Sequence, residues 1–295
     1  MFRFWKKSKE AEVFSSEGPE KESYTKLPNY TVVASLLTDP GCQREINEDS
    51  ISYLKPSDPA KLASKGMLAI VADGMGGHSA GEVASSLAVQ TVSLAYYESE
   101  GDVRSSLESA FLKANQRIFE TSREDDGMRG MGTTCTALVL QNGSAIAAHV
   151  GDSRLYLVRD EKIYLMTEDH SAVMEMVKQG LISLEQARHH PDKNVILRAL
   201  GSKEVVEVTT WTEPFPVREG DIFLLCSDGL YDLVEDEEIK QAVLISDPHT
   251  ACQRLVALAR ERGGPDNISV GIVRLIAPGE ARNPVPETRE LEVKL

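Results

Sequence analysis

Three apolar segments joined by very short links constrain the fold of this 295-residue chain more than any other feature. Their composition is typical of β-strands, at residues 134–140, 145–150 and 155–158. Asn142-Gly143, between the first two, is a strong signal for a two-residue hairpin turn. The second link, Gly151-Asp152-Ser153-Arg154, also predicts a tight turn. Because parallel strands need long crossovers, links this short predict antiparallel pairing of consecutive strands.

Helical patterns accompany these strands. Apolar residues recur at helical spacing after Ser79, where Ser79 and Glu82 form a predicted capping box, and again near residues 104–120. A third helix is predicted over about residues 249–262, ending at Gly263-Gly264. Further strands are predicted at residues 67–72, 205–211, 222–226 and 268–273. This order is typical of an α+β layered fold in which helices cover antiparallel sheets.

One globular domain is predicted over residues 29–276, because no Pro-rich linker and no internal repeat interrupts it. Residues 1–28 are predicted to form a flexible basic and polar leader, and residues 277–295 a flexible tail. The leader opens with Met1–Lys7, which mixes aromatic and basic residues. Two interpretations stay open for it: a disordered terminus, which is common at chain ends, and a weak contact with a membrane surface.

Composition excludes some classes of function. The formal net charge of −14 argues against nucleic acid as a partner, because phosphate backbones attract basic surfaces. The four cysteines show neither a CxxC pair nor zinc-ligand spacing, at positions Cys42, Cys135, Cys226 and Cys252. Isolated cysteines without a disulfide framework predict a reducing, cytoplasmic location.

Four short acidic motifs offer the most chemistry. They are Asn47-Glu48-Asp49, Asp73-Gly74, Ser227-Asp228-Gly229 and Asp266-Asn267. Each lies where an extended apolar run meets a turn, so rigid backbone holds the carboxylate while its oxygens stay free. An Asp-Gly pair alone is more often an ordinary turn, so the interpretation depends on the combination. Convergent aspartates with few basic neighbours are typical of sites for Mg²⁺ or Mn²⁺, which prefer oxygen ligands.

Eight motifs in order along the chain add a family resemblance. They are Arg44-Glu-Ile-Asn47-Glu48-Asp49, Asp73-Gly-Met-Gly-Gly-His78, Gly132-Thr-Thr134, Gly151-Asp-Ser-Arg154, Glu168-Asp169-His170-Ser171, Arg198-Ala-Leu-Gly201, Cys226-Ser-Asp-Gly229 and Gly264-Pro-Asp-Asn267. The set resembles the bacterial form of the metal-dependent serine/threonine protein phosphatases of type 2C. The resemblance implies an α+β fold, a four-layer α-β-β-α sandwich of two antiparallel sheets flanked by helices. It also implies a two-metal centre at one end of the sandwich.

The resemblance implies a set of metal ligands for two Mn²⁺ or Mg²⁺ ions. Asp73 resembles the carboxylate that bridges both cations, and Gly74 matches a backbone carbonyl ligand of the second cation. Asp228 and Asp266 match the ligands that complete the shell of the first cation. Asp152 resembles an aspartate that, together with Asp228, holds a third and weaker cation in bacterial members.

Catalytic residues are implied in the same way. Asp49, next to Glu48, matches an acidic pair that contacts the second cation directly or through its waters, and Arg44 matches the guanidinium that grips the substrate phosphate. Eukaryotic relatives carry a histidine where this chain has Met75, which cannot donate a proton. His78 belongs to the bacterial motif, and either His78 or a metal-bound water protonates the leaving group. A structural role beside the start of the helix is the alternative for His78.

Three neighbouring polar residues are expected to be structural. His149 and His170 are predicted to make structural hydrogen bonds, and Asp169 to orient a loop rather than bind metal. Residues 171–198 are predicted to form a helix followed by an exposed excursion, of which residues 177–194 match the flap that shapes substrate access in relatives.

The predicted reaction is hydrolysis of phosphoserine and phosphothreonine by a hydroxide bridging two divalent metals. Two cations that share a water lower its pKa toward neutrality, and a forked guanidinium grips two phosphate oxygens in a way that a lysine cannot. The expected partners are phosphorylated proteins, namely Ser/Thr kinases and their targets, and the chain is expected to be a monomer.

Two alternatives come from other classes of function. A catalytically dead adaptor that binds phosphoproteins would lack a metal carboxylate, but Asp73, Asp228 and Asp266 are all present. A calcium-binding structural module of the EF-hand type is excluded, because the chain has no DxDxDG loop with a terminal Glu.

Overall fold

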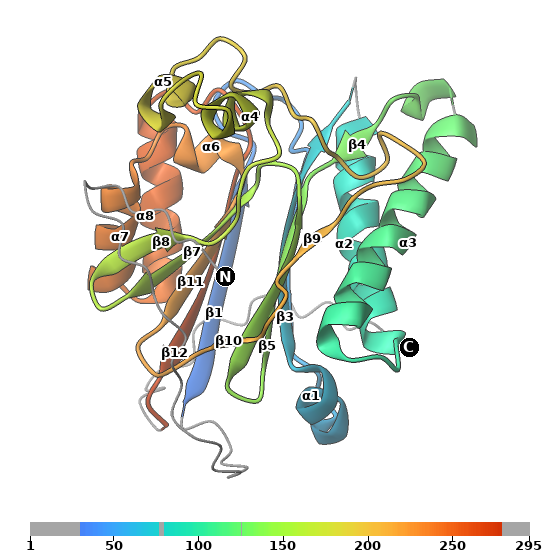
Figure 1. Cartoon of the computed structure of the whole chain (residues 1–295). Coiled ribbons are helices and arrows are strands. Elements are labelled where there is room, and N and C mark those ends of the chain that lie inside the picture. The colour runs from blue at the N-terminus through green and yellow to red at the C-terminus, as the bar shows by residue number, and fades with distance from the viewer. Residues whose placement is uncertain (1–29, 77–79, 125, 279–295) are drawn as a thin grey trace.

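The structure is a computed structural model, and it describes residues 30–76, 80–124 and 126–278. Helices, a first β-sheet, a second β-sheet and further helices follow one another as layers across the molecule (Figure 1). The predicted four-layer α-β-β-α sandwich is therefore confirmed. The predicted leader, the tail beyond residue 278, and both Ser79 and His78 lie outside the described residues.

The first sheet has seven antiparallel strands, in the order β10-β6-β5-β3-β2, with β4 paired to β3 and β9 to β6. Their bounds are β2 (Asp49–Leu54), β3 (Met67–Met75), β4 (Gly132–Thr133), β5 (Cys135–Gln141), β6 (Ser144–Val150), β9 (Thr209–Thr210) and β10 (Phe215–Pro216). Asn142 and Gly143 both have positive φ values, 47° and 80°, as a two-residue hairpin between β5 and β6 requires. This predicted hairpin is confirmed.

The second sheet has five antiparallel strands in the order β1-β12-β11-β7-β8. Their bounds are β1 (Thr31–Asp39), β7 (Arg154–Arg159), β8 (Lys162–Leu165), β11 (Ile222–Cys226) and β12 (Ile268–Ile276). Central strands of both sheets are buried on both faces, which explains their continuous apolar sequences. In β3, for example, Ile70 faces the helices while Val71 packs between the sheets, against a core that includes Phe223 and Leu225.

The predicted antiparallel pairing across Gly151–Arg154 is wrong. Strand β6 pairs with β5, β9 and β10, whereas β7 pairs with β11 and β8, so this link crosses from one sheet to the other. Gly151 makes the crossing possible, with φ at 108° and no room for a side chain: a Cβ there would lie 2.6 Å from the Cβ of Thr134. A tight turn at the corner of a sandwich has the same sequence signal as a hairpin.

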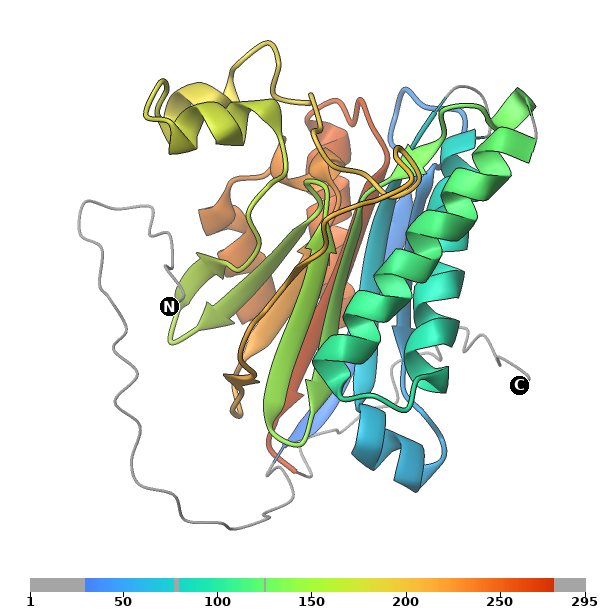
Figure 2. The ribbon, with the colours of Figure 1, turned by 45° about the vertical axis from the view of Figure 1, so that its right-hand side comes forward.

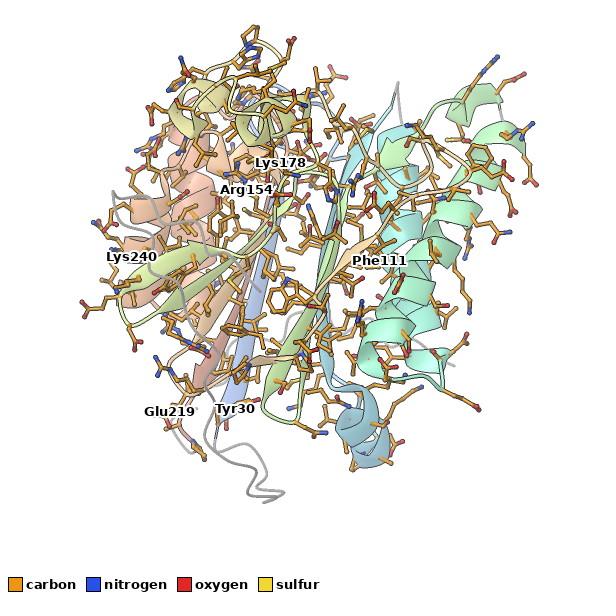
Figure 3. All side chains as sticks on the ribbon, in the orientation of Figure 1. Tyr30, Phe111, Arg154, Lys178, Glu219 and Lys240 are labelled. Atoms are coloured by element: carbon orange, nitrogen blue, oxygen red, sulfur yellow. The ribbon has the colours of Figure 1, made fainter. Side chains whose placement is uncertain are left out.

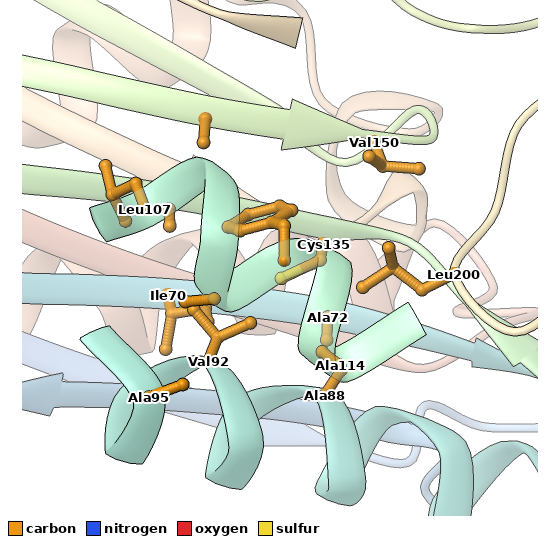
Figure 4. Close-up of a cluster of buried hydrophobic side chains, with 14 of the residues drawn as sticks. Ile70, Ala72, Ala88, Val92, Ala95, Leu107, Ala114, Cys135, Val150 and Leu200 are labelled. Atoms are coloured by element: carbon orange, nitrogen blue, oxygen red, sulfur yellow. The ribbon is translucent and has the colours of Figure 1, made fainter. Parts of the chain in front are cut away.

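Helices cover both outer faces. Their bounds are α1 (Pro59–Lys65), α2 (Ala80–Glu98), α3 (Val103–Glu124), α4 (Ala172–Lys178), α5 (Leu184–Arg188), α6 (Asp228–Tyr231), α7 (Asp236–Ile245) and α8 (Pro248–Glu261), with a short 3₁₀ helix at Asp126–Met128. Small residues such as Ala88 of α2 and Ala114 of α3 let both helices pack closely on Ile70 and Ala72 of β3 (Figure 4). Helix α8 packs on β1 and β12.

The predicted strand at residues 205–211 is mostly wrong, because only Thr209–Thr210 form a strand. The Nδ2 group of Asn115 in α3 donates to the carbonyls of Lys203 at 3.1 Å and Glu204 at 3.0 Å. These bonds hold the preceding backbone against α3 and away from the sheet, and Val205 is left 79% exposed. Residues 171–198 contain α4 and α5, which lie above the ends of the sheets (Figure 2).

None of the helices in residues 30–76, 80–124 and 126–278 is both long enough and apolar enough to cross a membrane.

Candidate metal centre

The predicted acidic ligands lie at one end of the sandwich. Asp49 begins β2 and is the direct cross-strand partner of Asp73 in β3. Asp152 lies in the link that follows β6. Asp228 begins α6, two residues after the end of β11, and Asp266 precedes β12 by two residues. The pairings β5–β6 and β11–β12 place these strand ends at the same edge, the upper one in Figure 1. Five different positions along the chain therefore bring carboxylates to one place.

The carboxyls repel one another electrostatically. Burial raises the pKa of Asp73 well above its ordinary value, and the neighbouring charges of Asp49, Asp228, Asp152 and Asp266 raise it further. The pKa of Asp228 is also raised well above its ordinary value, first by burial and then by Asp152 and other carboxylates. Such a group of like charges is stable only when protons or bound cations neutralise part of it.

Among residues 30–76, 80–124 and 126–278, three buried carboxylate oxygens have no hydrogen-bond partner: Asp49 Oδ1, Asp228 Oδ1 and Glu48 Oε1. Burying an oxygen without a hydrogen-bond partner costs free energy of folding. Carboxylate oxygens are the ligands that hard divalent cations prefer. The donor set therefore fits Mg²⁺ or Mn²⁺. Within the described residues, no group of three or more His, Cys, Asp or Glu side chains is already arranged as a coordination shell.

Hydroxyl groups fix the backbone and side chains of two of these aspartates. Ser227 donates to Asp49 Oδ2 at 2.7 Å and accepts from the Ser269 N–H at 3.0 Å. Thr133 donates its hydroxyl to the Asp73 carbonyl at 2.8 Å, while Thr134 Oγ1 accepts from the Asp73 N–H at 2.9 Å. Sequence reasoning did not predict these supporting roles, although all three hydroxyls lie within the quoted motifs.

Asn267 is another supporting residue whose role the sequence did not reveal. Its Oδ1 accepts from the Glu48 N–H at 2.7 Å, and its Nδ2 donates to the carbonyls of Pro40 at 3.1 Å and Ile46 at 3.0 Å. One side chain thus attaches the loop that carries Arg44, Glu48 and Asp49 to the start of β12.

Gly74 is held in a space that admits no side chain. Its N–H donates to the Glu48 carbonyl at 3.1 Å. A Cβ at this position would lie 2.0 Å from the carbonyl oxygen of Gly81 and 2.5 Å from that of Glu48. Glycine therefore lets β3, the start of α2 and the Glu48 loop meet beside Asp73.

Arg44 lies at the edge of the same group. Its Nη2 donates to Asp266 Oδ2 at 2.8 Å, with the Arg44 side chain 49% exposed. The guanidinium is therefore accessible from solvent while it stands next to a predicted metal ligand. Seven of the predicted site residues are brought together here, and His78 lies outside the described residues.

Asp169 forms an ion pair with Arg154. It accepts from Arg154 Nη2 at 2.7 Å and from Arg154 Nε at 3.1 Å, and the Arg154 guanidinium lies 3.7 Å from the centre of the Tyr231 ring. Figure 3 shows Arg154 and Lys178 toward the upper end of the sheets. His149 makes a buried hydrogen bond to Thr136, and His170 makes a partly buried one to Thr209, which agrees with their predicted structural role.

Without cations, the free energy of unfolding is expected to fall as the pH rises from about 4 to about 7. Burial raises the pKa of Asp49 to about 6 and that of Asp152 to about 7, above the ordinary value of 3.8. The folded chain thus keeps protons that the unfolded chain has released, and each pKa difference of one lowers stability by about 1.4 kcal/mol as the pH rises. Chemical denaturation in chelator at pH 5 and pH 7.5 measures the effect. Equal stability at both pH values would contradict it.

Comparisons with known proteins agree with this arrangement. The family described as Protein phosphatase 2C matches residues 44–260. Serine/threonine phosphatase stp of Listeria monocytogenes is 37% identical over 248 residues, which are 81% of this chain and 94% of that protein. Protein phosphatase PhpP of Streptococcus pneumoniae is 37% identical over 246 residues, with 82% and 96% covered.

Solved structures show the same fold. The serine/threonine phosphatase PstP/Ppp of Mycobacterium tuberculosis superposes with a TM-score of 0.74 at 37% identity, covering 83% of this chain and 99% of that one. The catalytic domain of PstP in complex with two manganese ions gives a TM-score of 0.71 at 35% identity, with 84% and 99% covered. Residues 44–260, which the family model matches, contain every acidic residue of the centre except Asp266. The chain belongs to the protein phosphatase 2C family.

Proposed function

We propose that this chain is a protein serine/threonine phosphatase whose divalent cations bind at the carboxylate end of the sandwich. The observation that supports it most directly is the group of mutually repelling carboxyls with buried, unpartnered oxygens, beside an accessible guanidinium. The names of the relatives, and the two manganese ions in the PstP structure, agree with this activity.

Two Mn²⁺ or Mg²⁺ ions would be held by Asp73, Gly74, Asp49, Asp228 and Asp266. A third, weaker ion would be held by Asp152 together with Asp228. Bound divalent cations supply a water of lowered pKa as the nucleophile for attack on phosphorus. Removal of the cations is therefore expected to abolish phosphate release.

The chain's own residues orient the substrate phosphate, contact the cations and supply a proton to the leaving group. Arg44 offers a planar fork of N–H donors that matches two phosphate oxygens, and Asp266 holds that fork at the edge of the site at 2.8 Å. Asp49 accepts from Ser227, which fixes one oxygen and leaves the other free to contact a cation or its waters. His78 is the proposed proton donor to the leaving alkoxide, and a water molecule is the alternative donor.

The proposed substrates are phosphorylated proteins, in particular Ser/Thr kinases and their targets, as the family context implies. Catalysis is assigned to residues 29–276, with the flap at residues 177–194 shaping substrate access. We place the chain in the cytoplasm as a monomer that binds no nucleic acid, in keeping with its charge of −14 and its free cysteines. Weak membrane contact of residues 1–28 remains part of the proposal.

The test is phosphate release from a phosphothreonine peptide by the full chain, with Mn²⁺ and with chelator. Rapid release with Mn²⁺ that stops in chelator is the expected result. A folded protein that binds Mn²⁺ but releases no phosphate from phosphoserine or phosphothreonine would overturn the proposal in favour of a phosphoprotein-binding adaptor.

Arg44→Lys is expected to lower kcat/KM for the peptide by about 10- to 100-fold, because one ammonium cannot replace two parallel charge-assisted hydrogen bonds. Steady-state kinetics at saturating Mn²⁺ measure the change. Arg218→Lys is the matched control, since Arg218 pairs with Asp160 on an exposed surface. If the two variants had the same kcat/KM, Arg44 would not bind the phosphate.

A further inference from the structure

His170 holds the link that carries Asp152 by two hydrogen bonds. The His170 N–H donates to the Gly151 carbonyl at 2.8 Å, and the Gly151 N–H donates to His170 Nδ1 at 3.1 Å. Both polar groups of the Gly151 backbone are therefore bound to a single residue that is only 8% exposed. Asp152 is the next residue along the chain, so the position of its backbone depends on His170.

The hydrogen bonds define the tautomer of His170. Because Nδ1 accepts from Gly151, it carries no proton, and in a neutral imidazole the proton then belongs to Nε2. His170 Nε2 lies 3.0 Å from Thr209 Oγ1, which can accept that proton in a hydrogen bond. The ring is thus held on both sides, by Gly151 and by β9.

A second histidine supports the same link from the other side. Thr136 donates its hydroxyl to the Ser153 carbonyl at 2.9 Å, so it accepts from His149 Nδ1 at 2.8 Å. The rings of His149 and His170 lie 4.7 Å apart, centre to centre. Asp152 therefore stands between two anchored neighbours, and the anchor on its Gly151 side is His170.

His170 also lies at the start of the segment that contains the flap. The His170 carbonyl accepts from the Leu197 N–H at 2.7 Å, and the Ala172 N–H donates to the Val195 carbonyl at 2.8 Å. These bonds join residues 170–172 to residues 195–197, here called the flap stem. The stem closes the segment that contains α4 and α5 (Figure 2). His170 is therefore bonded at the base of the segment that includes the flap.

We propose that His170 is a positioning residue that couples the flap stem to Asp152, and through Asp152 to cation binding. The inference rests on the proposed function of Asp152 as a ligand of the weaker cation. Movement of the stem shifts the His170 backbone, and the two bonds to Gly151 transmit that shift to the adjacent carboxylate. A phosphoprotein that contacts the flap therefore changes the affinity for the weaker cation, and the cation in turn steadies the stem.

Two substitutions separate the bonds of the imidazole. The amide of asparagine reaches about as far as Nδ1, so His170→Asn can keep the bond to Gly151 and loses the bond to Thr209. The longer glutamine reaches toward Nε2, so His170→Gln keeps the bond to Thr209 and loses the side-chain bond to Gly151, while the backbone bond from the His170 N–H to the Gly151 carbonyl remains. Thr209→Val is the matched control that removes only the outer bond.

Mn²⁺ binding to the full chain, measured by calorimetry without substrate, is the first readout. His170→Gln is expected to weaken the weaker Mn²⁺ site by about tenfold or more, as is typical when a residue supporting a metal ligand is lost. His170→Asn and Thr209→Val are expected to bind Mn²⁺ like the wild type. The proposal is overturned if all three variants bind alike, or if His170→Asn is impaired as much as His170→Gln.

Hydrogen exchange of the wild-type chain is the second readout, and it remains informative if His170→Gln fails to fold. Saturation with Mn²⁺ is expected to slow exchange of the stem amides of Ala172 and Leu197. Unchanged exchange there would overturn the coupling. Neither readout requires turnover, so a wild type that releases no phosphate would refute the proposed function and still leave this comparison to decide the role of His170.

Discussion

Asp73→Asn is expected to lower kcat/KM for a phosphothreonine peptide by more than about 100-fold, which exceeds the usual cost of losing a residue that merely supports a metal ligand. Asp73 is the cross-strand partner of Asp49. The neighbouring charges of Asp228, Asp152 and Asp266 help to raise the pKa of its carboxyl. An amide in its place keeps the size of the side chain but removes the negative charge that attracts cations. The measurements are peptide hydrolysis at increasing Mn²⁺ and direct Mn²⁺ binding by calorimetry.

The same substitution is expected to leave the cation-free protein at least as stable as the wild type. Removing one of several repelling, buried carboxyls relieves electrostatic strain at neutral pH. Asp160→Asn is a suitable control, since Asp160 lies in the β7–β8 turn at φ 51°, a conformation that asparagine tolerates. Unimpaired hydrolysis by a folded Asp73→Asn protein would show that this carboxylate does not bind the essential cations.

The second large effect concerns stability. Asp169→Ala is expected to lower the free energy of unfolding by about 3–5 kcal/mol, because it leaves the Arg154 guanidinium buried without a counter-charge. The side chains of Arg154 and Asp169 are only 18% and 8% exposed, and their shortest N–O distance is 2.7 Å. Urea denaturation in chelator measures the change without a contribution from bound cations.

Two comparisons make that result specific. Asp160→Asn breaks the exposed ion pair with Arg218 without straining the backbone at its positive φ, and it is expected to cost no more than about 1 kcal/mol. The double variant Arg154→Met with Asp169→Leu removes both charges and is expected to recover most of the stability lost in Asp169→Ala. A loss of less than 1 kcal/mol in Asp169→Ala would mean that water reaches Arg154 when its partner is absent.

Predictions from local sequence succeeded where the chemistry itself is local. Asn142-Gly143 forms the predicted hairpin because both residues tolerate positive φ. Asp73 and Asp228 were placed correctly near the ends of β3 and β11, because both apolar runs lead into Asp-Gly pairs, although β3 continues through Met75. The helix that ends near Gly263-Gly264 was predicted well, and it ends with the Gly264 N–H bound to the Ala259 carbonyl.

Features that depend on distant residues were not predictable in this way. The Gly151 link looks like a hairpin, but its direction depends on contact with Thr134 and on which strands are free to pair. Asn267 binds the Glu48 N–H across 219 positions of sequence, and nothing in its immediate neighbours indicates that bond. Family resemblance supplied the identity of the site residues, whereas the contacts that hold them became visible only in three dimensions.

The place of β12 in its sheet has a consequence for protein synthesis. This strand, the last of the described chain, lies between β1, the first, and β11. Before residue 276 has left the ribosome, β1 has no neighbour in its sheet, and Asp266 cannot be set beside Arg44. Because chains emerge from the amino terminus onward, an unfinished copy holds most of the acidic residues but no complete centre. Premature release from the ribosome should therefore yield fragments without phosphatase activity, so that only finished chains act on the phosphoproteins of the cell.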